Sequence, residues 1–328
     1  MKRLLALAEY IRKNYQYIII LAVAAGLILG GWTSAPGKAL QANSQALTFL
    51  MILFISLTIT PRQFALVLRQ PLPLLAGLLL NFVYMPLVCW ALARLFVSDS
   101  ELALGVILVG VVPCAGMAAV WTALLKGDVP LGMGINASTM LLSPFLIPAL
   151  VMLLAGSSVT ISAWEMFRQL ALILLLPFGL GVGLRWLMEQ KWKIQPYLQL
   201  FPALSALTAV LLMFAVCNVN VPLLTSRLDL LPSLLATTAL VSPLGFFVPY
   251  LLSGKIFKWE QRIAVTYASG MKNLPIAVGL AFTSFGRLAG LPVALAFILQ
   301  MLTASLFYRY LMARQAKIPV RRAIADKS

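Results

Sequence analysis

The stretch YASGMKNLPI, residues 267–276, places a lysine in the middle of a hydrophobic segment. Between Arg262 and Arg287 lie 24 residues, and Lys272, the tenth of them, is the only charged one. That length suits one membrane crossing at a rise of about 1.5 Å per residue. The nearer end of the segment is then roughly 14 Å from Lys272, too far for the ammonium to reach the lipid headgroups. The sequence therefore predicts a positive charge near the middle of the membrane.

Residues on both sides of Lys272 favour a break in the helix at this depth. Gly270 and Asn273 flank the lysine, and Pro275 removes one backbone donor from the following turn. Irregular backbone inside a membrane survives only where protein or a water-filled cavity solvates it. A charged side chain there is by default a candidate functional residue. We therefore expect a discontinuous helix with Lys272 at its break.

The composition is that of an all-α polytopic membrane protein. Of the 328 residues, 62% are hydrophobic and 10% are charged, whereas soluble domains have about 25% charged residues. The net charge of +16 comes from basic residues in loops and tails, which favours membrane topology over nucleic-acid binding. There is no histidine, and no Asp or Glu falls within a predicted span, so no acid–base pair remains for an enzyme. We expect no metal site and no cofactor.

Ten hydrophobic segments divide the chain. They lie at about 17–32, 45–60, 72–93, 102–125, 130–154, 166–188, 199–217, 231–253, 263–286 and 291–311. We expect two five-helix repeats, at 17–157 and 158–312, between a basic N-terminal segment at 1–16 and a basic tail at 313–328. Because five is odd, a duplicated unit enters the membrane from the opposite side, which predicts inverted repeats.

The fourth span of each half carries a proline near its middle. Pro113 is the twelfth of 24 uncharged residues between Glu101 and Lys126, and Pro275 has an equivalent place in the ninth span. Interrupted segments at corresponding positions of two halves are a sequence marker of a transporter's binding site. Proline kinks are also common in membrane helices, which is the simpler explanation of this pair.

The basic residues are distributed unevenly between the two sides of these spans. Of the 25 Lys and Arg residues, 19 lie in the terminal segments and in the loops on the same side, and five lie on the opposite side. The remaining one, Lys272, lies within a span. Such an excess marks the cytoplasmic side. We expect a multi-pass protein of the bacterial inner membrane with both termini in the cytoplasm.

Polar side chains within the spans are candidates for a substrate site. Cys114 follows the proline of the fourth span, and a thiolate suits soft species such as trivalent arsenic, although a buried cysteine more often packs as a small hydrophobe. Asn81 and Asn136 lie inside the third and fifth spans, where they either line a cavity or bond helix to helix. Together with Asn273, they are candidate partners of Lys272 or of the substrate.

The chain resembles the superfamily that joins bile acid:sodium symporters with arsenite permeases. Four motifs carry the resemblance: PRQF at 61–64, MP at 85–86, KGD at 126–128 and GMKN at 270–273. The resemblance implies ten helices in two inverted five-helix repeats, with a panel domain and a core domain. It also implies discontinuous fourth and ninth helices that cross near the substrate site.

The two branches of this superfamily imply different chemistry at the site. Sodium-coupled members have a Ser-Asn pair after the fourth-helix break and a Glu and a Gln in the ninth helix. The matching residues here are Ala118, Ala119, Ala268 and Lys272, which implies that the sodium sites are dismantled and that the ammonium replaces the bound cation. The arsenite branch is similar around Cys114, but its acidic residue in the ninth helix is missing.

The sequence therefore predicts a sodium-independent secondary transporter that binds a small molecule within the lipid bilayer. The leading substrate hypothesis is export of arsenite or a similar small solute. The alternative is an organic anion, with Lys272 either replacing sodium or binding the anion. A proton that leaves Lys272 during the cycle is a candidate for coupling.

Overall fold

The computed structural model describes residues 2–60, 69–156, 162–191, 197–226, 228–286 and 288–325. In these ranges the chain is helical, and the only β-type pairing is an isolated bridge between Cys114 and Lys272. The prediction of an all-α, multi-pass membrane protein is confirmed.

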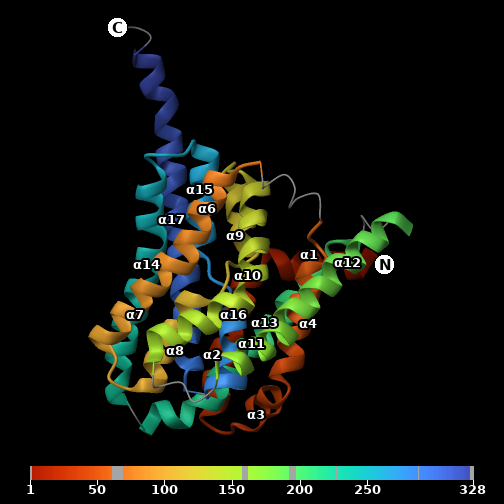
Figure 1. The fold of residues 1–328 in the computed structure, drawn as a ribbon, viewed down its shortest axis with the longest axis vertical. Coiled ribbons are helices and arrows are strands. Elements are labelled where there is room, and N and C mark those ends of the chain that lie inside the picture. The colour runs from red at the N-terminus through yellow and green to blue at the C-terminus, as the bar shows by residue number, and fades with distance from the viewer. Residues whose placement is uncertain are drawn as a thin grey trace.

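The α-helices of the described residues follow one another along the chain (Figure 1). They are α1 (Lys2–Lys13), α2 (Tyr15–Gly30), α3 (Ala35–Ala42), α4 (Ser44–Ser56), α6 (Pro71–Leu79), α7 (Met85–Phe96), α8 (Ser100–Val111), α9 (Met117–Leu124), α10 (Val129–Ala155), α11 (Ala163–Leu170), α12 (Leu176–Lys191), α13 (Leu200–Ser226), α14 (Leu231–Ser253), α15 (Trp259–Gly270), α16 (Leu274–Leu280) and α17 (Gly290–Ala325). One wider π-helical turn joins α6 to α7, another joins α11 to α12, and a third extends α16; these turns are Leu80–Tyr84, Ala171–Leu175 and Ala281–Phe285.

Each of the ten predicted spans overlaps one helix or a run of consecutive helices. Within the described residues, six helices are long and apolar enough to cross a membrane, or up to eight if each of two bent pairs counts as one span. The bent pairs are α1 with α2, at 75°, and α3 with α4, at 63°. The fourth and ninth predicted spans consist of shorter helices because each is interrupted.

Two boundaries differ from the sequence prediction. The second predicted span, 45–60, is preceded by a separate helix, α3, which the sequence does not predict and which meets α4 at an angle of 63°. At the other end of the chain, the predicted tail from residue 313 continues α17 as far as Ala325. Residues 312–316, MARQA, are good helix formers, so nothing in them ends the helix where the hydrophobic segment ends.

The helices pack in two groups that are joined in the middle of the molecule. Helix α13 packs against α1, α2, α3 and α4, and α12 packs against α4. In the second group α14 packs against α7, α15 and α17, while α8 packs against α7, α10 and α17. Figure 1 shows α4 and α12 on one side of the molecule and α14 and α17 on the other. Helix α16 contacts α4 and α13 of the first group as well as α17 of the second.

Glycines allow close approach inside the first group. A β-carbon on Gly26 of α2 would lie 2.8 Å from the carbonyl oxygen of Phe214, and one on Gly30 would lie 2.6 Å from that of Asn218. Helices in membranes associate through such close packing of small residues. The pairing of α2 with α13 therefore depends on the absence of side chains at these two positions.

Candidate functional site

The two helix breaks cross and satisfy each other's backbone groups. Helix α8 ends at Val111 and α9 begins at Met117, while α15 ends at Gly270 and α16 begins at Leu274. The amide of Ala115 donates to the carbonyl oxygen of Met271 at 2.7 Å, and the amide of Asn273 donates to that of Pro113 at 2.8 Å. Backbone groups released from two helices inside the membrane thus form a short antiparallel bridge.

The ammonium of Lys272 is held behind this bridge. Its Nζ donates to the carbonyl oxygen of Asn81 at 2.9 Å, to the side-chain oxygen of Asn81 at 3.1 Å and to the carbonyl oxygen of Val112 at 3.0 Å. An ammonium has three hydrogens, so these three acceptors match its capacity. Lys272 is only 1% exposed. The positive charge of Lys272 is therefore solvated by oxygen atoms of the protein.

The acceptors of Lys272 are themselves held in place. The side-chain nitrogen of Asn81 donates to the carbonyl oxygens of Gly77, at 2.9 Å, and Ala268, at 3.1 Å, which fixes its oxygen toward the lysine. The backbone of Lys272 exchanges two hydrogen bonds with the amide side chain of Gln300, at 2.9 and 3.0 Å. Three segments far apart in the sequence therefore converge on one residue.

The position of Val112 suits a positive charge. Val112 directly follows α8, so its carbonyl oxygen lies at the negative end of that helix dipole. In broken membrane helices, such C-terminal ends and unwound carbonyls coordinate sodium or protons. Lys272 Nζ thus occupies a place where the fold itself favours a cation.

Cys114 and Asn136 stabilise the other side of the crossing. The side chain of Asn136 donates to the carbonyl oxygen of Cys114 at 2.6 Å, and the amide of Cys114 donates to the hydroxyl of Thr139 at 3.2 Å. The thiol of Cys114 donates to the carbonyl oxygen of Ala115 at 3.4 Å and is fully buried. Asn136 thus acts in this structure as a backbone clamp, and the thiol has no exposed surface.

No group of three or more His, Cys, Asp or Glu residues in the described ranges could hold a metal ion. The three cysteines, Cys89, Cys114 and Cys217, are all free and buried.

A cavity of about 560 Å³ lies between the two groups of helices, next to the crossing. Its walls come from α1, α2, α4 and α13 on one side and from both helix breaks, α10 and α17 on the other. Of the residues predicted to bind substrate, Lys272 and Asn273 are among those that line it, and Lys272 contributes almost no exposed surface. Asn81, Cys114 and Asn136 lie behind the lining.

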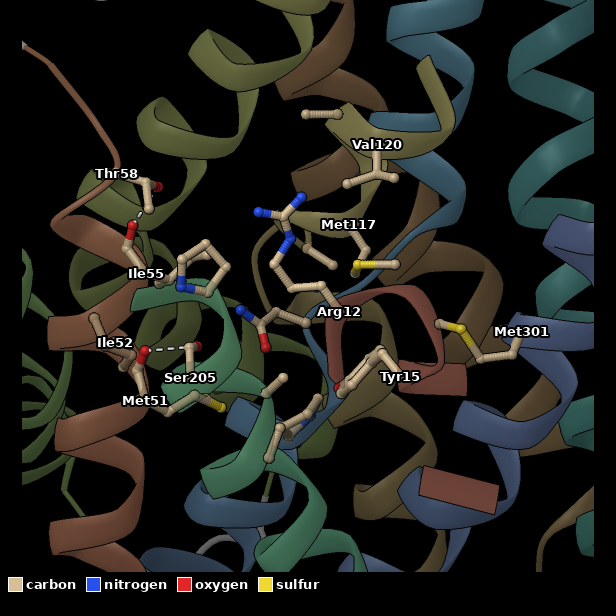
Figure 2. A pocket seen from close by; sticks show the side chains of 18 of the residues that line it. Arg12, Tyr15, Met51, Ile52, Ile55, Thr58, Met117, Val120, Ser205 and Met301 are labelled. Carbon is tan, nitrogen blue, oxygen red and sulfur yellow. Dashed lines mark hydrogen bonds between the residues drawn. The ribbon is translucent and has the colours of Figure 1, made fainter. Parts of the chain in front are cut away.

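The cavity is mainly apolar. The larger apolar side chains that line it include Met51, Ile52, Ile55, Met117, Val120, Met133, Phe297 and Met301. Apart from the buried Lys272, its charged side chains come from α1: Glu9, Arg12 and Lys13. Figure 2 shows the guanidinium of Arg12 inside the pocket, with Thr58 on one side and Met117 and Val120 on the other.

The contribution of α1 to the cavity is not predicted from the sequence, which indicates only a basic N-terminal segment at 1–16. A signal was present, because apolar residues alternate with basic ones at helical spacing in KRLLALAEYIRK. That pattern shows an amphipathic helix, but it does not show that the helix folds back at 75° to α2 and reaches the cavity.

Comparisons with known proteins show which chains this sequence is similar to. The chain is 28% identical to the uncharacterized protein YbaS of Bacillus subtilis over 73% of this chain and 79% of that protein. It is 26% identical to the uncharacterized sodium-dependent transporter YocS of the same organism, over 87% and 91% of the two chains. It is 29% identical to the probable sodium/metabolite cotransporter BASS1, chloroplastic, of Oryza sativa subsp. japonica, over 81% and 64%. The model of the Sodium Bile acid symporter family matches residues 46–227, more than half of the chain, and the protein therefore belongs to this family of membrane transporters.

Proposed function

We propose that the protein is a secondary transporter that moves an amphipathic organic anion without sodium, and that Lys272 takes the place of the sodium ion. The observation that carries the proposal is the coordination of Lys272 Nζ by three oxygen atoms: the backbone carbonyl of Val112 at the helix break, and both the backbone carbonyl and the side-chain oxygen of Asn81. A built-in cation there holds the two broken helices together permanently. Ion binding is then no longer needed to form the site.

The neighbouring residues support replacement of the ion. Sodium requires oxygen ligands, and Ala118, Ala119 and Ala268 provide no side-chain oxygen at the positions where the sodium-coupled branch has them. Asn81 bridges Lys272 to the carbonyl oxygen of Ala268 instead. One relative is named a sodium-dependent transporter and another a probable sodium/metabolite cotransporter, which favours a sodium-coupled ancestor from which this arrangement diverged.

The cavity supports an amphipathic anion as the substrate. The apolar walls favour a hydrophobic body, and Arg12 supplies a positive charge inside the pocket. Within the described residues Arg12 has no carboxylate at ion-pair distance. The start of α9, at Met117, also lines the cavity and presents the positive end of its dipole. Lys272 is a weaker candidate as the anion receptor, because its three hydrogens already have acceptors.

Arsenite export is the second candidate, and one observation favours it: Cys114 is at the crossing of the breaks, paired with Lys272. The thiol is nevertheless fully buried and does not line the cavity. A soft ligand has to be exposed to its substrate before it can bind arsenic. The geometry therefore supports an organic anion as the substrate better than arsenite, and replacement of Cys114 distinguishes the two substrate hypotheses.

We propose further that the ten helical segments all cross the bacterial inner membrane, as inverted repeats at 17–157 and 158–312 that form panel and core domains. Both termini are then cytoplasmic, and the cavity, which α1 lines, is open to the cytoplasm. On the opposite side α16 closes against α4, where Gly279 packs on Thr48. Alternating access follows if this contact opens when the cytoplasmic side closes.

The proposal is tested with purified protein in liposomes and a labelled bile acid, taurocholate, as an amphipathic monoanion. Exchange across the membrane is measured in sodium medium and in choline medium. We expect equal rates in the two media. A steep and saturable dependence on sodium contradicts the role of Lys272, and absence of any exchange of taurocholate contradicts the substrate class.

A further inference from the structure

A cluster of positive charge lies where α15 and α17 pack against the end of α14, away from the cavity. The Cζ atom of Arg262 lies 3.4 Å from the centre of the Tyr250 ring, and its Nε donates to the Tyr250 carbonyl oxygen at 2.9 Å. Arg314 donates to the hydroxyl of Tyr250 at 3.2 Å, and its Cζ lies 5.9 Å from the same ring. Tyr250 is only 1% exposed. Two guanidinium groups thus meet on one buried aromatic side chain.

This charge is not balanced by the part of the protein that the structure describes. In those ranges neither Arg262 nor Arg314 has a carboxylate within 4.0 Å. Glu260 lies two positions before Arg262 on α15, and residues two apart on a helix do not face each other. Two guanidinium groups on one ring repel each other, and an anion that bridges them converts that repulsion into attraction.

The surroundings are those of a membrane boundary. Leu251 and Ile256, near the end of α14, are 61% and 64% exposed, and Phe247, one turn earlier, is 45% exposed. Lys255 and Lys258 are exposed in the connection to α15. This connection belongs to the side of the molecule that carries most of the basic residues. Exposed apolar side chains therefore lie directly beside the unbalanced charge.

We propose that Arg262 and Arg314 bind the phosphate diester of an anionic phospholipid, whose acyl chains lie along the exposed faces of α14 and α17. Guanidinium groups match phosphate oxygens with paired hydrogen bonds. Basic pockets between membrane helices on the cytoplasmic side are typical sites for anionic headgroups. The bound lipid ties α15, the first half of the broken helix that carries Lys272, to its neighbours α14 and α17. This site is independent of the transported substrate.

The test is native mass spectrometry of the full-length protein in a neutral detergent. Phosphatidylglycerol and phosphatidylcholine with identical acyl chains are titrated separately, and inorganic phosphate is added in a third series. We expect phosphatidylglycerol to bind more tightly than phosphatidylcholine. The double variant Arg262→Gln with Arg314→Gln should lose affinity for phosphatidylglycerol, by about fivefold for each guanidinium removed. Arg309→Gln, which removes an exposed arginine of α17 outside the cluster, should leave the affinity unchanged.

Three results overturn the proposal: equal affinity for the two lipids, an unchanged preference for phosphatidylglycerol in the double variant, or displacement of that lipid by equimolar inorganic phosphate. The last result would identify a site for free phosphate instead of a lipid. If the double variant does not fold, Arg314→Gln alone decides, because Arg314 is exposed and its loss leaves no buried gap. An unchanged lipid preference in Arg314→Gln then contradicts the site.

Discussion

Lys272 Nζ donates to the carbonyl oxygen of Val112 at 3.0 Å, so the cation of one broken helix lies at the negative end of the other. The two residues are 160 positions apart and belong to different halves of the chain. The hydrogen bond is charge-assisted and buried, which makes it stronger than a neutral one. The same lysine therefore links the two halves both through its side chain and through the backbone bridge to Cys114.

The first prediction is that Lys272→Ala abolishes transport. The change leaves three oxygen acceptors without their donor, and an unsatisfied buried acceptor costs about 1–3 kcal/mol. The crossing of the breaks then loses the charge that holds it. Exchange of taurocholate is measured in liposomes at matched protein content, and thermal unfolding is recorded in parallel.

Lys38→Ala is the control, because Lys38 is an exposed lysine of α3 that does not line the cavity. Near-normal exchange by the Lys272→Ala protein would show that the lysine is merely solvated at this place and has no role in transport.

The second prediction is that Cys114→Ser leaves organic-anion transport close to the wild-type rate. The thiol is buried and makes one hydrogen bond, to Ala115, that a hydroxyl also makes. Arsenite resistance is measured with the same variant in cells that lack their own arsenite exporter. Loss of resistance in Cys114→Ser, but not in Cys89→Ser or Cys217→Ser, would instead establish arsenite as the substrate.

The sequence predicts the centre of this molecule because its signals are local. One lysine in 24 otherwise uncharged residues, with Gly270 and Pro275 beside it, indicates a solvated break without any knowledge of the fold. The proline in the equivalent span of the first half indicates the partner segment. An amide inside a span needs hydrogen bonds, which makes Asn81 a candidate partner of Lys272, and in the structure its side-chain oxygen does accept from the ammonium.

The remaining features depend on packing between distant segments. Whether a polar side chain faces a cavity or a neighbouring carbonyl depends on how α10 rotates against the break, which no period in the sequence reveals. Asn136 and Cys114 accordingly lie behind the cavity lining. Likewise, the carbonyl of Val112 is available as an acceptor only because α8 ends one residue before it. The bend between α1 and α2, which brings Arg12 to the cavity, is also a matter of packing.

The third prediction concerns Arg12. Its guanidinium lies inside the pocket, so Arg12→Gln should raise the KM for taurocholate by roughly tenfold or more, since a hydrogen bond to a charged group contributes about 1.5–3 kcal/mol. The kcat should change little, because Arg12 takes no part in the crossing of the helix breaks. Rates are measured over a range of taurocholate concentrations.

The uncharged methyl ester of cholate serves as the matched ligand, since it keeps the steroid body without the anion. Binding of this ester should be the same in wild-type and Arg12→Gln protein. An equal loss of affinity for taurocholate and for the ester would mean that Arg12 shapes the pocket rather than binding the charge.

The fourth prediction concerns topology. If ten segments cross the membrane, a reporter at the C-terminus lies in the cytoplasm and one inserted at Leu228–Leu230, between α13 and α14, lies outside. Paired reporter fusions that are active on opposite sides measure this directly. Activity of both reporters on the same side contradicts the ten-span arrangement.

The last prediction follows from the ammonium as a substitute for sodium. Lys272→Gln with Ala268→Glu removes the built-in cation and returns two oxygen-bearing side chains to positions where the sodium-coupled branch has them. We expect this double variant to transport taurocholate only in sodium medium, whereas Lys272→Gln alone should be inactive in both media. The introduced carboxylate makes the variant depend on sodium, because Ala268 is fully buried and an uncompensated glutamate there is strongly unfavourable unless a cation binds.

Exchange is measured in sodium and in choline, and sodium-dependent thermal stabilisation is recorded as a second readout. Stabilisation by sodium without transport would still show that the crossing accepts the ion. A variant that neither binds sodium nor transports in either medium would show that Lys272 does more than replace the cation.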